Sequence, residues 1–278
     1  MKRSGEAIAA ARAEGRAALV GYLPAGFPSR DAAIEAIRAL VDGGADVIEV
    51  GLPYSDPVID GPTIQVATEQ ALRSGTRIAD VLHTVEAVAA TGVATVVMTY
   101  WNPVLAYGLD RFAGDLASAG GSGLITPDLI PEEAGEWLES SDRHDLERIF
   151  LVAPSSSDDR IAATTRCCRG WVYAASTMGV TGTRTAVSSS APDLVARVRA
   201  TSTIPVGVGL GVSNAAQASE VAGYADAVIV GSAFVRCLLD APDASAGAAA
   251  VGALAAELAA GVRSAAASGS RTDADAAV

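Results

Sequence analysis

The chain alternates between short runs of apolar residues and longer stretches with helical spacing. The short runs are mostly continuous rather than alternating, which is typical of parallel strands buried on both faces. The sequence predicts strands at Ala18–Leu23, Asp46–Gly51, Ala94–Met98, Gly123–Thr126, Ile149–Ala153, Trp171–Ser176, Pro205–Gly209 and Ala227–Gly231.

Between these runs, apolar residues recur every three to four positions, which indicates amphipathic helices. In the first such stretch, Ile34, Ile37 and Leu40 share one face, and Pro28-Ser29 supplies a start signal. The predicted helices are Asp31–Val41, Ile78–Ala90, Leu109–Ala119, Pro131–Leu138, Asp158–Cys168, Pro192–Arg199, Asn214–Ala222 and Ala233–Leu239.

Eight strand–helix units in about 240 residues favour an α/β protein with a single (β/α)8 TIM barrel. A doubly wound sheet is the alternative, but its dinucleotide-binding form favours a G-x-G-x-x-G motif after the first strand, where this sequence has none. We expect an extra helix at residues 2–15 that closes the barrel floor and an alanine-rich terminal helix at residues 245–266. Residues 1–266 would then form one catalytic domain, followed by a disordered tail at residues 267–278.

Composition narrows the class of protein. The chain has 278 residues, of which 50% are hydrophobic and 19% charged, so it can build a sizeable core. Its net charge of −12 argues against a nucleic-acid or anionic-membrane surface. Glu257 interrupts the apolar run Ala246–Val262, which we therefore expect to be a soluble helix rather than a membrane span. No targeting segment is expected at the N-terminus, where Glu6 and Arg12 interrupt any apolar run.

The chain is poor in the side chains that most often carry metal or nucleophilic chemistry. These are His83, His144, Cys167, Cys168, Cys237 and Lys2. Their positions fit neither an H-E-x-x-H nor a C-x-x-C motif, so we expect no metal site. An internal Schiff-base lysine is excluded because the single lysine lies at the terminus. Three thiols in this length favour a reducing cytoplasm over a disulfide framework.

Carboxyl groups gather around the second predicted strand. Glu49 stands inside the apolar run, on the same face as Val47, and Asp56 and Asp60 follow in the next loop. A buried carboxyl is costly unless it is paired or protonated, so Glu49 is either part of a structural hydrogen bond or a general acid/base with a raised pKa. Each aspartate alone also fits ordinary turn chemistry. Together, carboxyls in different environments can divide acid and base roles.

Glycine-rich segments follow the last three predicted strands, at residues 179–182 (GVTG), 209–213 (GLGVS) and 231–233 (GSA). In barrels of this kind, the loops after strands seven and eight frequently bind phosphate together with a helix N-terminus. Each loop alone is equally an ordinary turn. Their order favours a phosphate site, to which Ser232 can add a hydroxyl.

The stretch at residues 49–65 reads EVGLPYSDPVIDGPTIQ. Further characteristic segments are residues 98–103 (MTYWNP), 107–108 (YG), 124–129 (LITPDL), 150–154 (FLVAP), 173–182 (YAASTMGVTG), 209–213 (GLGVS) and 231–233 (GSA). Together these segments resemble one known family, the alpha subunits of tryptophan synthase. The resemblance spans about residues 17–240 in order, and residues 49–65 are its most specific part.

The resemblance implies a lyase of tryptophan biosynthesis that cleaves indole-3-glycerol phosphate to indole and glyceraldehyde 3-phosphate. Glu49 matches the family's general acid/base, and Asp60 matches the carboxylate that binds the indole N–H. Tyr173 matches a tyrosine near the reacting glycerol. Thr181 matches a threonine of a mobile loop that closes over the site. Aldol cleavage needs an electron sink, and protonated indole can itself supply one.

The resemblance also assigns binding residues. The matching phosphate positions are Gly182, Gly211, Gly231 and Ser232. The positions that match the indole walls, and that would look the same as ordinary barrel core, are Tyr100, Ile125, Leu151 and Leu210. The chain departs from the family's usual residues at Tyr54 and Leu210, where each change keeps an apolar wall. It also departs at Ile59, which places a larger side chain than the usual alanine beside Asp60. None of these changes removes a catalytic group.

The family resemblance further implies a partner. The expected partner is a tryptophan synthase beta subunit carrying pyridoxal phosphate, in an alpha2beta2 heterotetramer, with no cofactor in this chain. In the family, the loops around Asp56 and Thr181 respond to that partner. A stand-alone indole-3-glycerol-phosphate lyase and a catalytically silent regulatory subunit remain alternatives, and another phosphate-binding barrel such as a sugar-phosphate isomerase is a further one.

Overall fold

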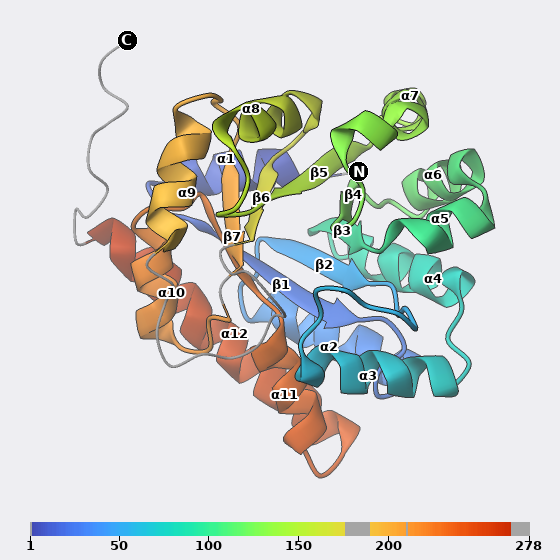
Figure 1. Ribbon diagram of the computed structural model, residues 1–278. Helices are drawn as coiled ribbons and strands as arrows, with labels where there is room; N and C mark the ends of the chain where they lie inside the picture. Colours follow the sequence, from blue (N-terminus) through green and yellow to red (C-terminus); the bar gives the residue numbers. More distant parts are fainter. Residues whose placement is uncertain (1, 176–189, 210, 268–278) are drawn as a thin grey trace.

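Eight parallel strands close into a barrel in the order in which they occur along the chain (Figure 1). The computed structural model describes residues 2–175, 190–209 and 211–267. The strands are β1 (Ala18–Pro24), β2 (Val47–Gly51), β3 (Ala94–Met98), β4 (Gly123–Thr126), β5 (Glu147–Val152), β6 (Val172–Ala175), β7 (Val206–Gly209) and β8 (Ala227–Val230). The predicted (β/α)8 barrel is therefore confirmed. Ser176, predicted as the end of the sixth strand, lies outside the described residues.

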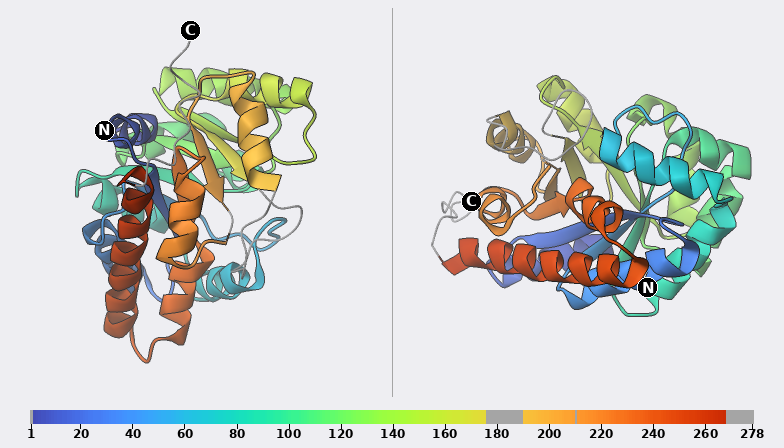
Figure 2. Two further views of the ribbon diagram at one scale, coloured as in Figure 1. Left: turned by 90° about the vertical axis from the view of Figure 1, so that its left-hand side faces the viewer. Right: turned by 90° about the horizontal axis from the view of Figure 1, so that it is seen from below.

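Helices surround the barrel and follow the strands in turn (Figures 1 and 2). Within the described part of the chain they are α1 (Ser4–Ala13), α2 (Arg30–Asp42), α3 (Pro62–Arg73), α4 (Ile78–Ala89), α5 (Trp101–Tyr107), α6 (Leu109–Ser118), the 3-10 turn η1 (Pro131–Glu133), α7 (Gly135–Arg143), α8 (Asp158–Cys167), α9 (Ser190–Arg199), α10 (Ala215–Ala222), α11 (Ser232–Asp240) and α12 (Ala244–Ala267). The predicted helical stretches all contain helix, with shifted ends.

Two helices were not predicted, and one prediction was wrong in detail. Helix α3 begins with Pro62 and α5 has Pro103 in its first turn, where proline is tolerated because no intrahelical N–H bond is lost there. Because proline usually marks a loop or the end of a helix, these two helices could not be recognised from the sequence pattern. The predicted helix Pro131–Leu138 is instead the short turn η1 followed by α7, which continues to Arg143.

The strands separate two apolar layers. Val47 faces the inside of the ring, whereas Ile48 and Val50 pack outward against the helices, which confirms the alternation predicted around Glu49. Helix α1 belongs to the inner layer, because its Ile8 is fully buried among the inward-facing strand residues. Helix α1 thus closes the barrel floor, as the sequence predicted.

The long helix α12 lies against the outside of the barrel, beside α2, α10 and α11 (Figure 2). By length and composition its residues Ala244–Ala265 could cross a membrane, but 44% of the most apolar window is buried within the protein. Val251 and Leu258 are fully buried there. Helix α12 therefore packs against the rest of the fold along one of its faces. Of the predicted tail, residues 268–278 lie outside the described residues.

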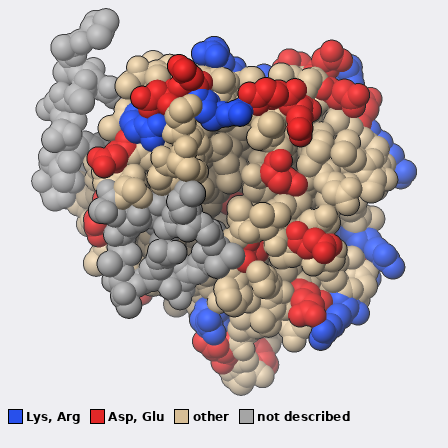
Figure 3. Space-filling model, in the orientation of Figure 1, with Lys and Arg blue, Asp and Glu red and all other residues tan. Residues whose placement is uncertain are grey.

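Charged side chains are spread over much of the described surface on the face that Figure 3 shows. On the face shown there, the Lys and Arg side chains of the described residues are dispersed among Asp and Glu. Several of these arginines form ion pairs with neighbouring acids, as Arg160 does with Glu132 and Arg197 with Asp158. On this face, the described Lys and Arg side chains therefore do not gather into a continuous basic stripe.

Candidate active site

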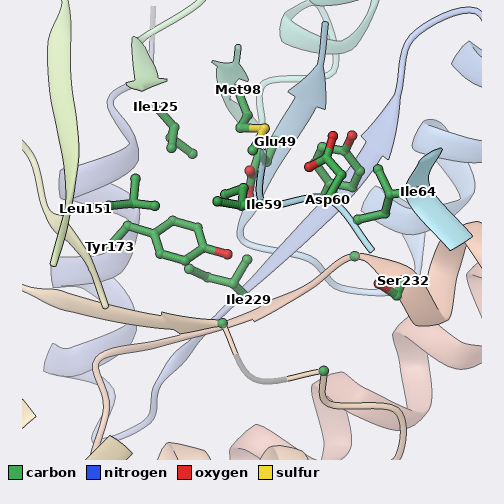
Figure 4. Close-up of a pocket in the computed structure, with 14 residues that line it drawn as sticks. Glu49, Ile59, Asp60, Ile64, Met98, Ile125, Leu151, Tyr173, Ile229 and Ser232 are labelled. Atoms are coloured by element: carbon green, nitrogen blue, oxygen red, sulfur yellow. The ribbon is translucent and has the colours of Figure 1, made fainter. Parts of the chain in front are cut away.

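A pocket of about 580 Å³, counted with its open mouth, lies at the carboxyl ends of the barrel strands (Figure 4). Functional groups of (β/α)8 barrels characteristically lie at this end. The lining residues are Tyr22, Glu49, Ile59, Asp60, Ile64, Met98, Ile125, Leu151, Tyr173, Gly209, Gly211, Ile229, Gly231 and Ser232. Most of the wall is apolar, so the few polar groups in it are conspicuous.

Glu49 enters this pocket from the inner face of β2 and is 2% exposed. Its Oε2 atom has no hydrogen-bond partner among the described residues. Burial, and to a smaller extent the nearby negative charge of Asp60, raises the pKa of Glu49 to about 8. The side chain therefore holds a proton at neutral pH and can donate it to a bound molecule.

Asp60 ends the loop after β2, immediately before the N-terminus of α3. The loop is held by the hydroxyl of Tyr100, which accepts hydrogen bonds from the backbone N–H groups of Val58 (3.0 Å) and Ile59 (3.1 Å). The side-chain amide of Gln65 donates to the backbone carbonyl of Asp60 at 2.7 Å. These bonds direct the Asp60 carboxyl into the pocket (Figure 4).

The two carboxyls of the pocket differ in protonation. Burial raises the pKa of Asp60 to about 6, and a hydrogen bond from the Tyr100 hydroxyl opposes that rise. At pH 7 Asp60 is therefore mainly ionised while Glu49 is mainly protonated. A pair of carboxyls separated in this way can act as a general acid and a charge-stabilising base.

Two tyrosines complete the polar part of the pocket. Tyr173 projects from β6 and Tyr22 from β1, where it pairs with Glu49 of the neighbouring strand. Burial raises the pKa of both phenols, so both keep their protons. A Cβ atom on Gly209 would overlap the Tyr173 hydroxyl, which explains why β7 ends in glycine at this point.

The other end of the pocket suits an anion. Helix α11 begins here, with Gly231 as its N-cap and the buried Ser232 as its first residue. The first turn of a helix offers backbone N–H groups without intrahelical acceptors, and the helix dipole favours negative charge there. Gly211 has a φ of +70°, a conformation that most other residues rarely adopt, and its backbone borders the same space.

The structure brings most of the predicted site residues together. Those lining the pocket are Glu49, Asp60, Tyr173, Ile125, Leu151, Gly211, Gly231 and Ser232. Tyr100, predicted as an indole wall, lies behind the Asp60 loop and supports it. Thr181, Gly182 and Leu210 lie outside the described residues.

Four other lining residues were not predicted, and these are Tyr22, Ile64, Met98 and Ile229. Gly209, which also lines the pocket, belongs to the glycine-rich segment 209–213 that the sequence assigned to the phosphate site. All but Ile64 lie near the carboxyl ends of strands, where each is paired in register with a pocket residue of the neighbouring strand. Tyr22 pairs with Glu49, Met98 with Ile125 and Ile229 with Gly209. Aligning the inward positions of neighbouring strands with Glu49 is the signal that could have found them.

Neither histidine lines the pocket. His83 is 65% exposed beside Glu86, whereas His144 is half-buried and lies 3.3 Å from a carboxylate oxygen of Asp110. Within residues 2–175, 190–209 and 211–267, no group of three or more His, Cys, Asp and Glu side chains is arranged to hold a metal ion. The three cysteines are free thiols.

The whole barrel matches one set of known proteins. Residues 8–263 fit the sequence model of the tryptophan synthase alpha chain. The chain belongs to the tryptophan synthase alpha chain family.

Individual alpha chains agree over nearly their full length. The tryptophan synthase alpha chain of Acidothermus cellulolyticus is 65% identical, with 95% of this chain and 98% of the relative covered. The alpha chain of Salinispora arenicola is 63% identical with the same coverage.

Solved structures agree as well. A Mycobacterium tuberculosis tryptophan synthase structure superposes with a TM-score of 0.89 and 60% identity, covering 94% of this chain and 98% of that one. The tryptophan synthase alpha chain of Legionella pneumophila gives a TM-score of 0.83 at 32% identity, covering 95% and 98%. The barrel is thus shared with tryptophan synthase alpha chains even where two thirds of the residues differ.

Proposed function

We propose that this chain is a lyase that cleaves indole-3-glycerol phosphate to indole and glyceraldehyde 3-phosphate, as the alpha subunit of tryptophan synthase. The observation that carries the proposal is the pair of buried carboxyls, Glu49 and Asp60, whose pKa values of about 8 and about 6 place a proton donor and a carboxylate in one apolar pocket. Family membership supports the same activity.

Glu49 is the general acid in this proposal. Its neutral carboxyl donates a proton to indole C3, which makes that carbon tetrahedral and leaves a positive charge at the ring nitrogen. Asp60 accepts the indole N–H hydrogen bond and stabilises this charge, because it is ionised at neutral pH and lies in a poorly solvated pocket. The apolar side chains of Ile125 and Leu151 suit the indole ring.

Cleavage follows from this protonation. The Glu49 carboxylate takes the proton of the hydroxyl on the glycerol carbon attached to C3, and that carbon becomes the aldehyde. The carbon–carbon bond breaks and its electron pair restores the neutral indole ring. One proton is delivered and one removed, so the protonated indole is the electron sink. Tyr173 borders the glycerol part, and its neutral phenol can donate a hydrogen bond there.

The phosphate is assigned to the end of the pocket formed by Gly211, Gly231 and Ser232. Backbone N–H groups at the start of α11 would donate to its oxygens, together with the Ser232 hydroxyl. Binding energy from this remote group fixes the reacting carbon near Glu49.

An indole-release assay on indole-3-glycerol phosphate tests the proposal. We expect the wild-type chain to release indole and the Glu49→Gln variant to lose at least about 100-fold in kcat, as is usual when a general acid is removed. Glu35→Gln, on the exposed face of α2, is the matched control and should keep full activity. Indole release by Glu49→Gln at the wild-type rate would refute the mechanism.

The expected partner is a tryptophan synthase beta subunit, to which pyridoxal phosphate would belong. Large apolar side chains support a docking surface at the rim: Val58 is 70% exposed, Leu105 52% and Ile130 42%. They follow the neighbouring strands β2, β3 and β4, so they share the end of the barrel at which the pocket opens. Free thiols are consistent with a cytoplasmic complex.

Adding a beta subunit to the indole-release assay tests this partnership. We expect activation of about tenfold or more, equivalent to about 1.4 kcal/mol in the barrier. Leu105→Glu should abolish the activation and keep the basal rate, because Leu105 does not line the pocket. Equal turnover with and without the beta subunit would favour a stand-alone lyase instead.

A further inference from the structure

Tyr173 rests on a second aromatic ring deeper in the barrel. Trp171 directly precedes β6, is fully buried, and belongs to the inner apolar layer. The rings of Trp171 and Tyr173 are stacked, with centroids 6.0 Å apart and planes inclined by 27°. Because residues two apart in a strand share a face, Trp171 forms the support beneath Tyr173 on the side of the barrel floor.

Strand β7 makes room for both rings with two glycines. A Cβ atom on Gly207 would lie 2.7 Å from the Trp171 ring, and one on Gly209 would overlap the Tyr173 hydroxyl. Any larger residue at either position would displace an aromatic ring. The two rings therefore fill one space beside the glycines of β7. The position of the Tyr173 ring depends on that of the Trp171 ring, because they are stacked in this space.

Trp171 is fixed from below by helix α1. Its indole N–H donates to the Ser4 hydroxyl at 2.9 Å, and this hydroxyl donates to the carboxylate of Glu147. The backbone N–H groups of Ser4 and Gly5 also donate to that carboxylate, each at 2.9 Å. Ser4 is fully buried and Glu147 is 2% exposed, so these bonds are shielded from water.

These contacts form a continuous connection from the barrel floor to the pocket. The Glu147 carboxylate holds the first turn of α1, Ser4 holds the Trp171 indole, and the indole supports Tyr173. Nothing in the proposed chemistry requires Ser4, Trp171 or Glu147 to touch the substrate, since none of them lines the pocket. Their effect on the reaction would pass through the Tyr173 ring, and a small displacement of a reacting or orienting group can cost up to about 100-fold in rate.

We propose that Trp171, held by Ser4 and Glu147, is a positioning residue for Tyr173 in the cleavage reaction; this inference rests on the proposed function. The arrangement sets the tilt of the Tyr173 ring and with it the place of the phenol beside the glycerol part of the substrate.

Trp171→Leu tests the proposal in two backgrounds. In the wild-type chain we expect kcat for indole release to fall about tenfold while KM changes less than about threefold. In a Tyr173→Leu chain the same substitution should change kcat by less than about twofold, because the group that it positions is absent. An equal loss of kcat in both backgrounds, or a kcat within about twofold of the wild-type value in the first, would overturn the proposal.

Trp137 provides a matched control. It is also fully buried, and it packs against Trp101 outside the pocket rather than against a pocket residue. Trp137→Leu removes the same kind of side chain from the core, so we expect a comparable loss of thermal stability. Its kcat should stay within about twofold of the wild-type value, measured at a temperature where both variants are folded. A tenfold loss of kcat in Trp137→Leu would mean that general destabilisation explains the loss of kcat in Trp171→Leu, and it would overturn the proposal.

Ser4→Ala keeps the test decisive if Trp171→Leu does not fold. This variant removes the acceptor of the Trp171 N–H. In ring-labelled tyrosine NMR, the Tyr173 signal, assigned by its loss in Tyr173→Leu, should shift while the Tyr54 signal stays in place. An unchanged Tyr173 signal would refute the inference.

Absence of indole release by the wild-type chain would instead refute the proposed function, and the NMR result would still decide whether the barrel floor positions Tyr173.

Discussion

The hydroxyl of Tyr100 binds both the backbone and the side chain of the Asp60 loop. It accepts hydrogen bonds from the N–H groups of Val58 and Ile59, and it donates to the Asp60 carboxyl. One phenol thus sets the shape of the loop and limits the rise in the pKa of its carboxyl. This contact favours the ionised form of Asp60 at neutral pH.

Tyr100→Phe should shift the pH dependence of indole release. Removing the hydroxyl removes the bond that lowers the pKa of Asp60, so that pKa rises above 6 and the carboxylate form is lost at higher pH. We expect the acidic limb of kcat/KM to move upward by about one pH unit, which makes the loss of rate larger at pH 6 than at pH 8. Tyr54→Phe, which changes the ring packed 5.2 Å from Tyr100, is the control. Identical acidic limbs in wild type and Tyr100→Phe would contradict the role of the hydroxyl.

The raised pKa of Glu49 also predicts how stability changes with pH. Below pH 4.5 the carboxyl is protonated in both the folded and the unfolded chain and contributes nothing. Between pH 4.5 and about 8 only the unfolded chain releases the proton, so the free energy of unfolding falls as pH rises. Glu49→Gln should remove this part of the slope, on the order of 4 kcal/mol between pH 5 and pH 8.5.

Urea unfolding of wild type, Glu49→Gln and the control Glu35→Gln at those two pH values measures this difference. The control should keep the wild-type slope, because Glu35 is exposed. If Glu49→Gln loses as much stability as the wild type between the two pH values, Glu49 is not the buried, protonated acid that the pocket geometry indicates.

Ser232→Ala tests the anion end of the pocket. Loss of one hydrogen bond to a charged group costs about 1.5–3 kcal/mol, so KM for indole-3-glycerol phosphate should rise at least about tenfold with little change in kcat. Inorganic phosphate should also inhibit this variant more weakly than the wild type. Ser118→Ala is the matched control, because that hydroxyl donates to the backbone carbonyl of Gly114 on α6 and does not line the pocket. Equal KM values for Ser232→Ala and Ser118→Ala would place the phosphate elsewhere.

Helix α12 should contribute to the packed core through its buried face. Leu258 is fully buried, so Leu258→Ala should lower the free energy of unfolding by about 2–5 kcal/mol. Leu254 is half-buried on the same helix, so Leu254→Ala should lower the free energy of unfolding by less than about half as much. Guanidinium unfolding in detergent-free buffer makes the comparison. Equal losses from the two substitutions would mean that the helix does not pack as described.

The sequence predicted the barrel because its strands are continuous apolar runs and its helices carry one apolar face. Glu49 was predicted because a carboxyl in such a run is conspicuous. Tyr22 was missed for the opposite reason, since a tyrosine in a strand is ordinary, and only its pairing with Glu49 brings it into the pocket. The support given by Tyr100 could not be predicted either, because its hydrogen bonds reach residues about 40 positions away.

The closed order of the strands has a consequence for folding. Glu49 comes from β2, Tyr173 from β6, and Ser232 follows β8, which pairs with β1 to complete the ring. No continuous fragment that lacks β8 contains both the acid and the anion-binding helix. Recovery of indole release during refolding should therefore lag behind recovery of helical signal, and its rate should report the step at which the last strand joins the first.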